Sequence, residues 1–387
     1  MIVEFVFFLV LYLLIHSYLV YPISIFIFGS ITKKNIIRDP NYLPEITIII
    51  SVYNEENVIE NTLRQFLKTD YDHTKIQFVI GSDQSTDNTN NIIDSLKNEI
   101  PNLEFIRFNE RRGKSRVLND LIKCAKGEIL IFSDANTIYS PDAISKLVSY
   151  YSDNNVGGVS GRLLLLDHEK AFESGNLESK YWGIENWIKE NEGKLGYLIG
   201  ANGGIYSIRK DLFIPIPTDS PVADDFLISL KILEQNKLFL YEKTAIAREE
   251  IASDIKIEYK RRIRNNAFDL ASIKYIKELL KPRFGIISYA LWSHKIIRWF
   301  TPLLLIILSI LNLYLVFFNI FFLYLFFLQI AFYLSACLGF ISKKLGINLI
   351  FLTMCYYFVY MNIGLLLGII RFLRKKQTAF WQSTARI

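Results

Sequence analysis

Continuous apolar runs at both ends of the chain enclose a stretch in which apolar and polar blocks alternate. Residues 2–28 are almost unbroken apolar sequence, and 302–340 are long enough for two helices of the ~20 residues that cross a bilayer. The alternating stretch between them is typical of a soluble α/β domain. The pattern predicts an N-terminal transmembrane helix at 1–30, a globular domain at 42–281, interfacial and transmembrane helices at 284–372 and a C-terminal tail at 375–387.

Short apolar blocks in the central domain alternate with amphipathic helical patterns. Strands are predicted at 46–50, 76–80, 103–108 and 129–132, with helices after the first, second and third of them. Strands and helices that alternate at this spacing form parallel sheets. We therefore expect an α/β domain with a mostly parallel, doubly wound, Rossmann-like sheet and helices on both faces.

The strand at 129–132 leads directly into Ser133, Asp134 and Asn136. Its four apolar residues fit a strand buried on both faces, and ligands in such sheets bind beyond the carboxyl ends of strands. Asp134 and Asn136 offer oxygens two residues apart, which suits a hard divalent cation, Mg²⁺ or Mn²⁺, that holds a diphosphate. An Asx-rich turn that closes the strand is the alternative.

Composition supports a membrane protein. The 387 residues are 51% hydrophobic with a mean hydropathy of +0.24, which is too apolar for an ordinary soluble domain. The net charge of +6 is modest and no nucleic-acid motif occurs, so no nucleic-acid partner is expected. The three cysteines, Cys124, Cys337 and Cys355, lack metal-site spacing and predict neither a metal cluster nor a disulfide framework.

The N-terminal apolar segment has the features of a retained anchor. A signal peptide has a basic residue before its apolar region and small residues after it, whereas this segment has Glu4 before it and bulky residues after it. Lys33, Lys34 and Arg38 follow, and positive residues favour the cytoplasmic side. We expect a multi-pass protein of the plasma (inner) membrane, in contact with membrane lipids, with its globular domain in the cytoplasm.

Polar loops follow the ends of the predicted strands: Tyr53-Asn54-Glu55, Ser-Asp-Gln-Ser-Thr-Asp at 82–87, Gly113-Lys114 and Ser-Asp-Ala-Asn at 133–136. These loops resemble those of family 2 glycosyltransferases, especially the membrane-bound cellulose-synthase-like and hyaluronan-synthase-like branch. They occur in the family's order, and the resemblance covers nearly the whole chain. It implies a GT-A-type fold and an inverting hexosyltransferase that uses a UDP-sugar donor.

The resemblance also implies roles at the donor nucleotide. Tyr53 would stack on uracil, Glu55 would contact the nucleotide, and Asp83 would hydrogen-bond the uracil. Lys114 would meet the base or the diphosphate, and Asp134 would hold the metal. Taken singly, each of these residues could instead form a turn or cap a helix.

Two of these loops depart from the family pattern. Ser82 stands where the family usually has an aspartate, and Asn136 replaces the second aspartate of the Asp-x-Asp motif. An amide oxygen is a weaker metal ligand than a carboxylate, so the affinity for metal is expected to be reduced.

Residues 156–222 are expected to form the acceptor side. The segment 200–209 resembles the family's glycine-rich segment beneath the donor sugar, although a tight turn would also explain it. Asp224 and Asp225 stand beside the family's Thr-Glu-Asp motif, in which the last carboxylate takes the acceptor hydroxyl's proton. Asp225 aligns with that base and Asp224 with the preceding acid, and both could also cap a helix at 226–235.

A basic segment at 260–265 falls where the family has Gln-x-x-Arg-Trp. Arg264 matches the arginine, whereas Arg261 and Asn265 replace the glutamine and the tryptophan. Arg261 and Arg264 would neutralise the leaving diphosphate. The missing tryptophan normally stacks on the acceptor sugar, and a basic helix on anionic lipid is the alternative interpretation.

The apolar segment 349–372 is expected to lie along, or re-enter, the inner membrane surface. If it crossed the membrane, the basic residues at 371–376 would lie outside, against the positive-inside rule. We therefore predict three spanning helices, with a fourth crossing as the alternative.

The C-terminal tail resembles the gating loop of the related synthases. Trp381, Thr384 and Arg386 reproduce its spacing of aromatic, hydroxyl and cation, and would close over the donor nucleotide.

Three functions remain open from the sequence. The leading hypothesis is transfer from a UDP-sugar to an extracellular or capsular polysaccharide. The second is transfer of one sugar to a lipid carrier or glycolipid. The third is a non-catalytic subunit of a synthase complex, which Asp83, Asp134 and Asp225 together argue against.

Overall fold

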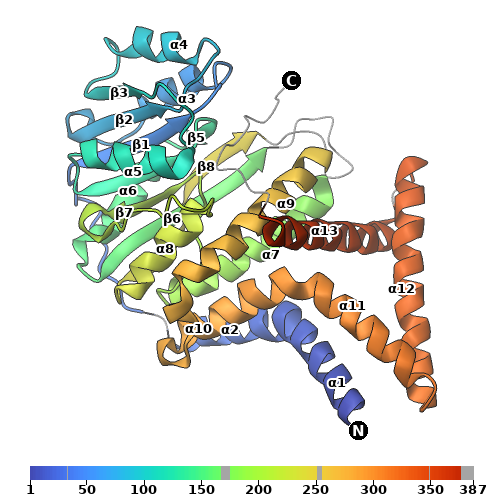
Figure 1. The fold of residues 1–387 in the computed structure, drawn as a ribbon. Coiled ribbons are helices and arrows are strands. Elements are labelled where there is room, and N and C mark those ends of the chain that lie inside the picture. Colours follow the sequence, from blue (N-terminus) through green and yellow to red (C-terminus); the bar gives the residue numbers. More distant parts are fainter. Residues whose placement is uncertain (33, 167–174, 251–254, 348, 376–387) are drawn as a thin grey trace.

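The computed structural model describes all residues except 33, 167–174, 251–254, 348 and 376–387. An α/β domain built on one eight-stranded sheet lies beside a group of long helices (Figure 1). The helices that approach the sheet from this group come from both ends of the chain.

The sheet has the strand order β3-β2-β1-β4-β7-β6-β8-β5. Strands β1 to β4 pair in parallel, as predicted, whereas β7 runs antiparallel to both β4 and β6, and β5 runs antiparallel to β8. The pair β6 and β8 is again parallel. The strands are β1 (Ile46–Val52), β2 (Ile76–Ser82), β3 (Leu103–Arg107), β4 (Ile129–Ser133), β5 (Thr137–Tyr139), β6 (Val156–Leu166), β7 (Tyr206–Arg209) and β8 (Leu238–Glu250).

Helices cover both faces of the sheet, as predicted. Because side chains alternate along a strand, Ile48 and Ile50 of β1 face one hydrophobic core while Ile49 faces another. The first core is closed by α3 (Ile59–Phe66), α4 (Thr89–Leu96) and α6 (Ala143–Val148). The second is closed by α5 (Lys114–Cys124), α7 (Gly175–Lys194), α8 (Asp224–Glu234) and helices of the apolar group, and α9 (Ile255–Ser272) follows β8.

Among the residues that the structure describes, four helical stretches are long and apolar enough to cross a membrane: 2–31, 286–315, 320–344 and 350–373. The first comprises α1 (Ile2–Ile15), the π-helical turn η1 (His16–Val20) and α2 (Tyr21–Ile31). The second comprises α10 (Ile286–Ala290), the π-helical turn η8 (Leu291–Ile296) and α11 (Ile297–Leu315). The segment 284–299, expected to be interfacial, is therefore continuous with the helix that follows it.

A hairpin at Asn319 separates α11 from α12 (Ile320–Lys344), and Asn319 Oδ1 accepts a hydrogen bond from Phe321 N at 2.9 Å. The last described helix, α13 (Ile350–Leu373), runs crosswise to α12 and reaches α9 of the α/β domain (Figure 1). There Asn266 Nδ2 donates to Leu365 O at 2.8 Å. An apolar helix thus covers the helix that bears Arg261 and Arg264.

Candidate active site

A cavity of about 1020 Å³ lies beyond the carboxyl ends of β1 and β4, between these strands and α7, α8, α9, η8 and α13. The structure brings eight of the predicted site residues to its wall: Glu55, Lys114, Asp134, Asn136, Asp224, Asp225, Arg261 and Arg264. Its position agrees with the rule for ligands in open α/β sheets.

Lys114 joins the loop after β4 to the start of α8. Its Nζ lies 3.0 Å from Asp134 Oδ1 and 3.2 Å from Asp224 Oδ2. Burial disfavours the charged ammonium, but the neighbouring carboxylates outweigh it and raise the pKa of Lys114 above its ordinary value. Lys114 therefore stays charged and holds two separate loops together. The end of the cavity that contains Lys114, Asp134 and Asp224 is called the donor end, because the resemblance implies that the donor binds there.

Asp225 lies in the first turn of α8, where Asp225 Oδ1 accepts a hydrogen bond from Phe226 N at 2.8 Å. The residue at the helix cap is Ala223, so neither aspartate occupies the cap position proposed as an alternative. Burial and the adjacent Asp224 raise the pKa of Asp225 to about 6. A carboxylate with this pKa is suited to accept a proton near neutral pH.

The glycine-rich segment packs directly against Asp225. A Cβ atom added at Gly203 would lie 2.9 Å from Asp225 Oδ2. The glycine is therefore needed for a close approach to the carboxylate, beyond any role in a turn.

Gly203→Ala is expected to lower turnover by about tenfold or more, because the new methyl group displaces the carboxylate by a fraction of an ångström. Steady-state kinetics measure this effect, and the thermal midpoint of unfolding shows whether the fold survives. Gly183→Ala is the matched control, since a Cβ there meets nothing within 4 Å. Equal turnover in the two variants would contradict the proposed contact.

The two arginines predicted to face the diphosphate lie three residues apart on α9, and such residues share a helix face. Burial and the Arg261 guanidinium lower the pKa of Arg264, while Asp134 opposes this shift. The basic face of α9 is therefore directed at the Asp134 end of the cavity, where a diphosphate would be held.

The residues at the predicted metal position fit a divalent cation that is completed by substrate phosphates. Asn136 Nδ2 donates to Glu249 Oε1 at 2.8 Å, which orients the amide beside Asp134. In the described part of the chain, no three Asp, Glu, His or Cys side chains are grouped as a metal site. Asp134, Asp224 and Asp225 lie around the Lys114 ammonium, and a divalent cation beside them would offset part of the negative charge that a donor diphosphate brings.

Two residues predicted to contact the donor, Tyr53 and Asp83, are not among those that line the cavity. Asp83 is fully buried and accepts hydrogen bonds from Arg112 N at 2.6 Å and Gly113 N at 3.0 Å. The guanidinium of Arg111 lies 3.2 Å from the centroid of the Tyr53 ring. Asp83 therefore fixes the loop that leads into Lys114, and the uracil contacts of Tyr53 and Asp83 remain predictions.

The predicted gating residues Trp381, Thr384 and Arg386 lie outside the described residues. Their role remains a prediction.

Sequence reasoning missed the charged residues at the end of the cavity that lies next to the apolar helices, which is called the membrane end. Lys189 of α7, Asp269 of α9 and Lys295 of η8 line this end. Burial raises the pKa of Asp269 to about 7, although Lys295 opposes this shift. The only pattern that could have revealed part of this group is Glu185, Lys189 and Glu192, which share one face of α7.

Comparisons with known proteins agree with this fold. Residues 47–213 match the model of the family described as Glycosyl transferase family 2. Poly-beta-1,6-N-acetyl-D-glucosamine synthase of Staphylococcus aureus (strain MSSA476) is 27% identical over 240 residues, which cover 61% of this chain and 57% of the relative. The synthase of the same name from Staphylococcus epidermidis is 27% identical over 225 residues, or 57% and 53% of the two chains. The chain thus matches little more than half of the length of these relatives.

A solved structure shares the architecture over almost the full length of this chain. A mannosyltransferase from Pyrobaculum calidifontis, in complex with GDP-Man and Mn²⁺, superimposes with a TM-score of 0.70 at 20% identity. The superposition covers 95% of this chain and 99% of the other. Residues 47–213 thus form a domain that matches glycosyltransferase family 2, and the chain has a GT-A-type fold, as its resemblance to the membrane-bound synthase branch implied.

Proposed function

We propose that this protein transfers a sugar, with inversion, from a UDP-sugar to an acceptor that reaches the cavity from the membrane. The observation that supports this most is the position of Asp225 beside the Lys114–Asp134–Asp224 cluster in one cavity. An acceptor hydroxyl oxygen attacks C1 of the donor sugar while its proton passes to the Asp225 carboxylate. The bond between C1 and the diphosphate oxygen breaks, and UDP leaves with that electron pair.

The charged residues at the donor end stabilise the leaving group in this proposal. Arg261 and Arg264 neutralise the diphosphate, and Lys114 holds Asp134 and Asp224 in place. Mg²⁺ or Mn²⁺, held by Asp134 and Asn136, would supply further positive charge when bound.

The relatives favour a polysaccharide as the product, and their name makes UDP-N-acetylglucosamine the first donor to test. A second candidate is transfer of one sugar to a lipid carrier or glycolipid, and the cavity wall favours it. Met354, Phe358 and Met361 of α13 line the same cavity as Asp225, so an acceptor with an apolar tail would find apolar contacts there. Size separation of the products made by membranes with labelled UDP-sugars distinguishes a polymer from a singly glycosylated lipid.

We also propose a multi-pass protein of the plasma (inner) membrane with three spanning helices, and α13 along the cytoplasmic surface. The crosswise direction of α13 and its packing against α9 support this arrangement (Figure 1). Its last turn carries Arg371, which is close enough to Arg264 to lower the pKa of that guanidinium. A basic helix end beside the donor site agrees with the positive-inside rule.

Cysteine labelling in intact cells tests this topology. A cysteine at Arg374 is expected to react with an impermeant thiol reagent only after permeabilisation, because α13 begins and ends on the cytoplasmic side. The control is a cysteine at Phe317, which is 80% exposed in the turn between α11 and α12 and is expected to react from outside. Reaction of the Arg374 variant from outside would establish a fourth crossing.

A further inference from the structure

The membrane end of the cavity contains two lysines without a carboxylate partner. Lys189 of α7 is 7% exposed, and its Nζ donates to Asn202 Oδ1 at 2.5 Å. Lys295 of η8 lines the same cavity. Neither ammonium forms an ion pair with any residue that the structure describes. A buried ammonium that lacks an ion-pair partner, such as that of Lys189, is costly in free energy unless a ligand compensates its charge.

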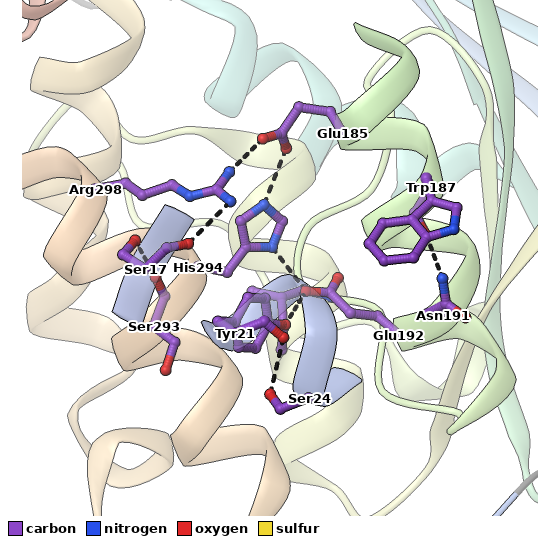
Figure 2. A network of polar contacts seen from close by, with 11 residues as sticks. Ser17, Tyr21, Ser24, Glu185, Trp187, Asn191, Glu192, Ser293, His294 and Arg298 are labelled. Carbon is purple, nitrogen blue, oxygen red and sulfur yellow. Dashed lines mark hydrogen bonds and ion pairs between the residues drawn. The ribbon is translucent and has the colours of Figure 1, made fainter. Parts of the chain in front are cut away.

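The nearby glutamates are already engaged in a buried network (Figure 2). His294 Nδ1 lies 2.7 Å from Glu192 Oε1, and His294 Nε2 lies 2.9 Å from Glu185 Oε2. Both ring nitrogens of His294 thus face carboxylate oxygens. Arg298 also pairs with Glu185, and the Tyr21 hydroxyl donates to Glu192 at 2.5 Å.

Four carboxylates lie near enough to Lys189 or Lys295 to interact with its charge, but the structure records no ion pair between them and either lysine: Glu185, Glu192, Asp225 and Asp269. Burial opposes ionisation of Glu185, but His294 and Arg298 hold its pKa well below the ordinary value. Both of its oxygens are used in these contacts, and Glu185 forms no ion pair with Lys189. Burial and the ammonium of Lys295 lower the pKa of Lys189 to about 8, although Glu185, Asp225 and Glu192 oppose this shift, and a bound anion would raise the pKa.

The segment 200–203 places the two lysines next to the proposed base. Asn202 accepts the hydrogen bond of Lys189, and a Cβ at Gly200 would lie 3.9 Å from Lys295 Cε. The same segment contacts Asp225 through Gly203. A ligand bound by the lysines would therefore lie near the carboxylate that is proposed as the base.

We propose that Lys189 and Lys295 form an anion subsite that binds the phosphate group of a lipid-linked acceptor. This phosphate is a different group from the donor diphosphate. The proposed function places the diphosphate at the other end of the cavity, where Lys114 pairs with Asp134 and Asp224. The attached lipid would lie against the side chains that α13 and η1 contribute to the cavity: Tyr18, Met354, Phe358, Met361 and Leu365. This inference rests on the proposed function, in which an acceptor hydroxyl reaches Asp225.

Equilibrium binding to the purified full-length protein, without any UDP-sugar, tests the subsite. The probes are farnesyl phosphate, farnesol and inorganic phosphate in the same detergent. Farnesyl phosphate is expected to bind at least about tenfold more tightly than farnesol, which is the gain in affinity that one charge-assisted contact provides. Lys295→Gln should remove this preference and Lys295→Arg should retain it. Lys274→Gln is the control and should bind as the wild type does, because Lys274 pairs with Asp219 outside the cavity.

Equal affinity of the wild type for farnesyl phosphate and farnesol would overturn the proposal, as would an unchanged preference in Lys295→Gln. Inorganic phosphate that binds as tightly as farnesyl phosphate would show a plain anion site and overturn the lipid assignment. Because no donor is present, failure of sugar transfer in a separate assay would refute the proposed function without changing this result.

Discussion

Replacement of Asp225 by asparagine is expected to lower turnover by at least about 10²-fold, the usual contribution of a general base, and to leave UDP binding nearly unchanged. The amide keeps the shape of the side chain and can still accept a hydrogen bond from Phe226 N, but it cannot take a proton from the acceptor. Turnover and UDP affinity, measured on the same purified sample, separate the two effects. Asp211→Asn, at an exposed position outside the cavity, is the control.

The pH profile supplies an independent check on Asp225. Since burial and Asp224 raise its pKa to about 6, the base is ionised above that pH and protonated below it. The wild-type rate is therefore expected to fall as the pH decreases through about 6, and this acid limb should be missing from the residual activity of Asp225→Asn. Wild-type turnover in the variant would remove Asp225 from the mechanism.

Asp134→Ala is expected to abolish metal-dependent activity, with a loss of about 10²–10³-fold from the missing stabilisation of the diphosphate. The substitution removes the proposed metal ligand and the partner of Lys114 Nζ at 3.0 Å. Binding of Mn²⁺ to the protein with UDP, followed by electron paramagnetic resonance, measures the metal site apart from turnover.

Asn136→Asp is the matched variant, because it restores a second carboxylate at the position that departs from the family motif. It is expected to bind Mn²⁺ more tightly than the wild type does. Full wild-type activity in excess chelator would instead show that transfer does not need a metal.

The parallel half of the sheet could be predicted because its strands are short, mostly apolar runs. The cores of β1, β2 and β4 are buried on both faces, and such strands have a clear sequence pattern. The antiparallel half could not be predicted in the same way. β7 has only four residues after a glycine-rich segment, and β6 begins with two glycines after Val156, so neither shows the pattern.

The donor loops were predictable because they follow strand ends in sequence, whereas the membrane end of the cavity was not. Lys189 and Lys295 come from helices about a hundred residues apart, and only the packing of η8 against α7 brings them together. Motif comparison also could not show that Asp83 is enclosed by the backbone of its neighbouring loop, since that depends on how residues 111–113 fold.

The most direct test of the central claim is UDP release by the purified protein across a panel of UDP-sugars, with Mg²⁺ or Mn²⁺ and an extract of membrane lipids as acceptor source. We expect at least one UDP-sugar, with UDP-N-acetylglucosamine tested first, to release UDP in the wild type and not measurably in Asp225→Asn. Binding of UDP without release from any UDP-sugar would contradict an enzymatic role and favour a non-catalytic subunit of a synthase complex.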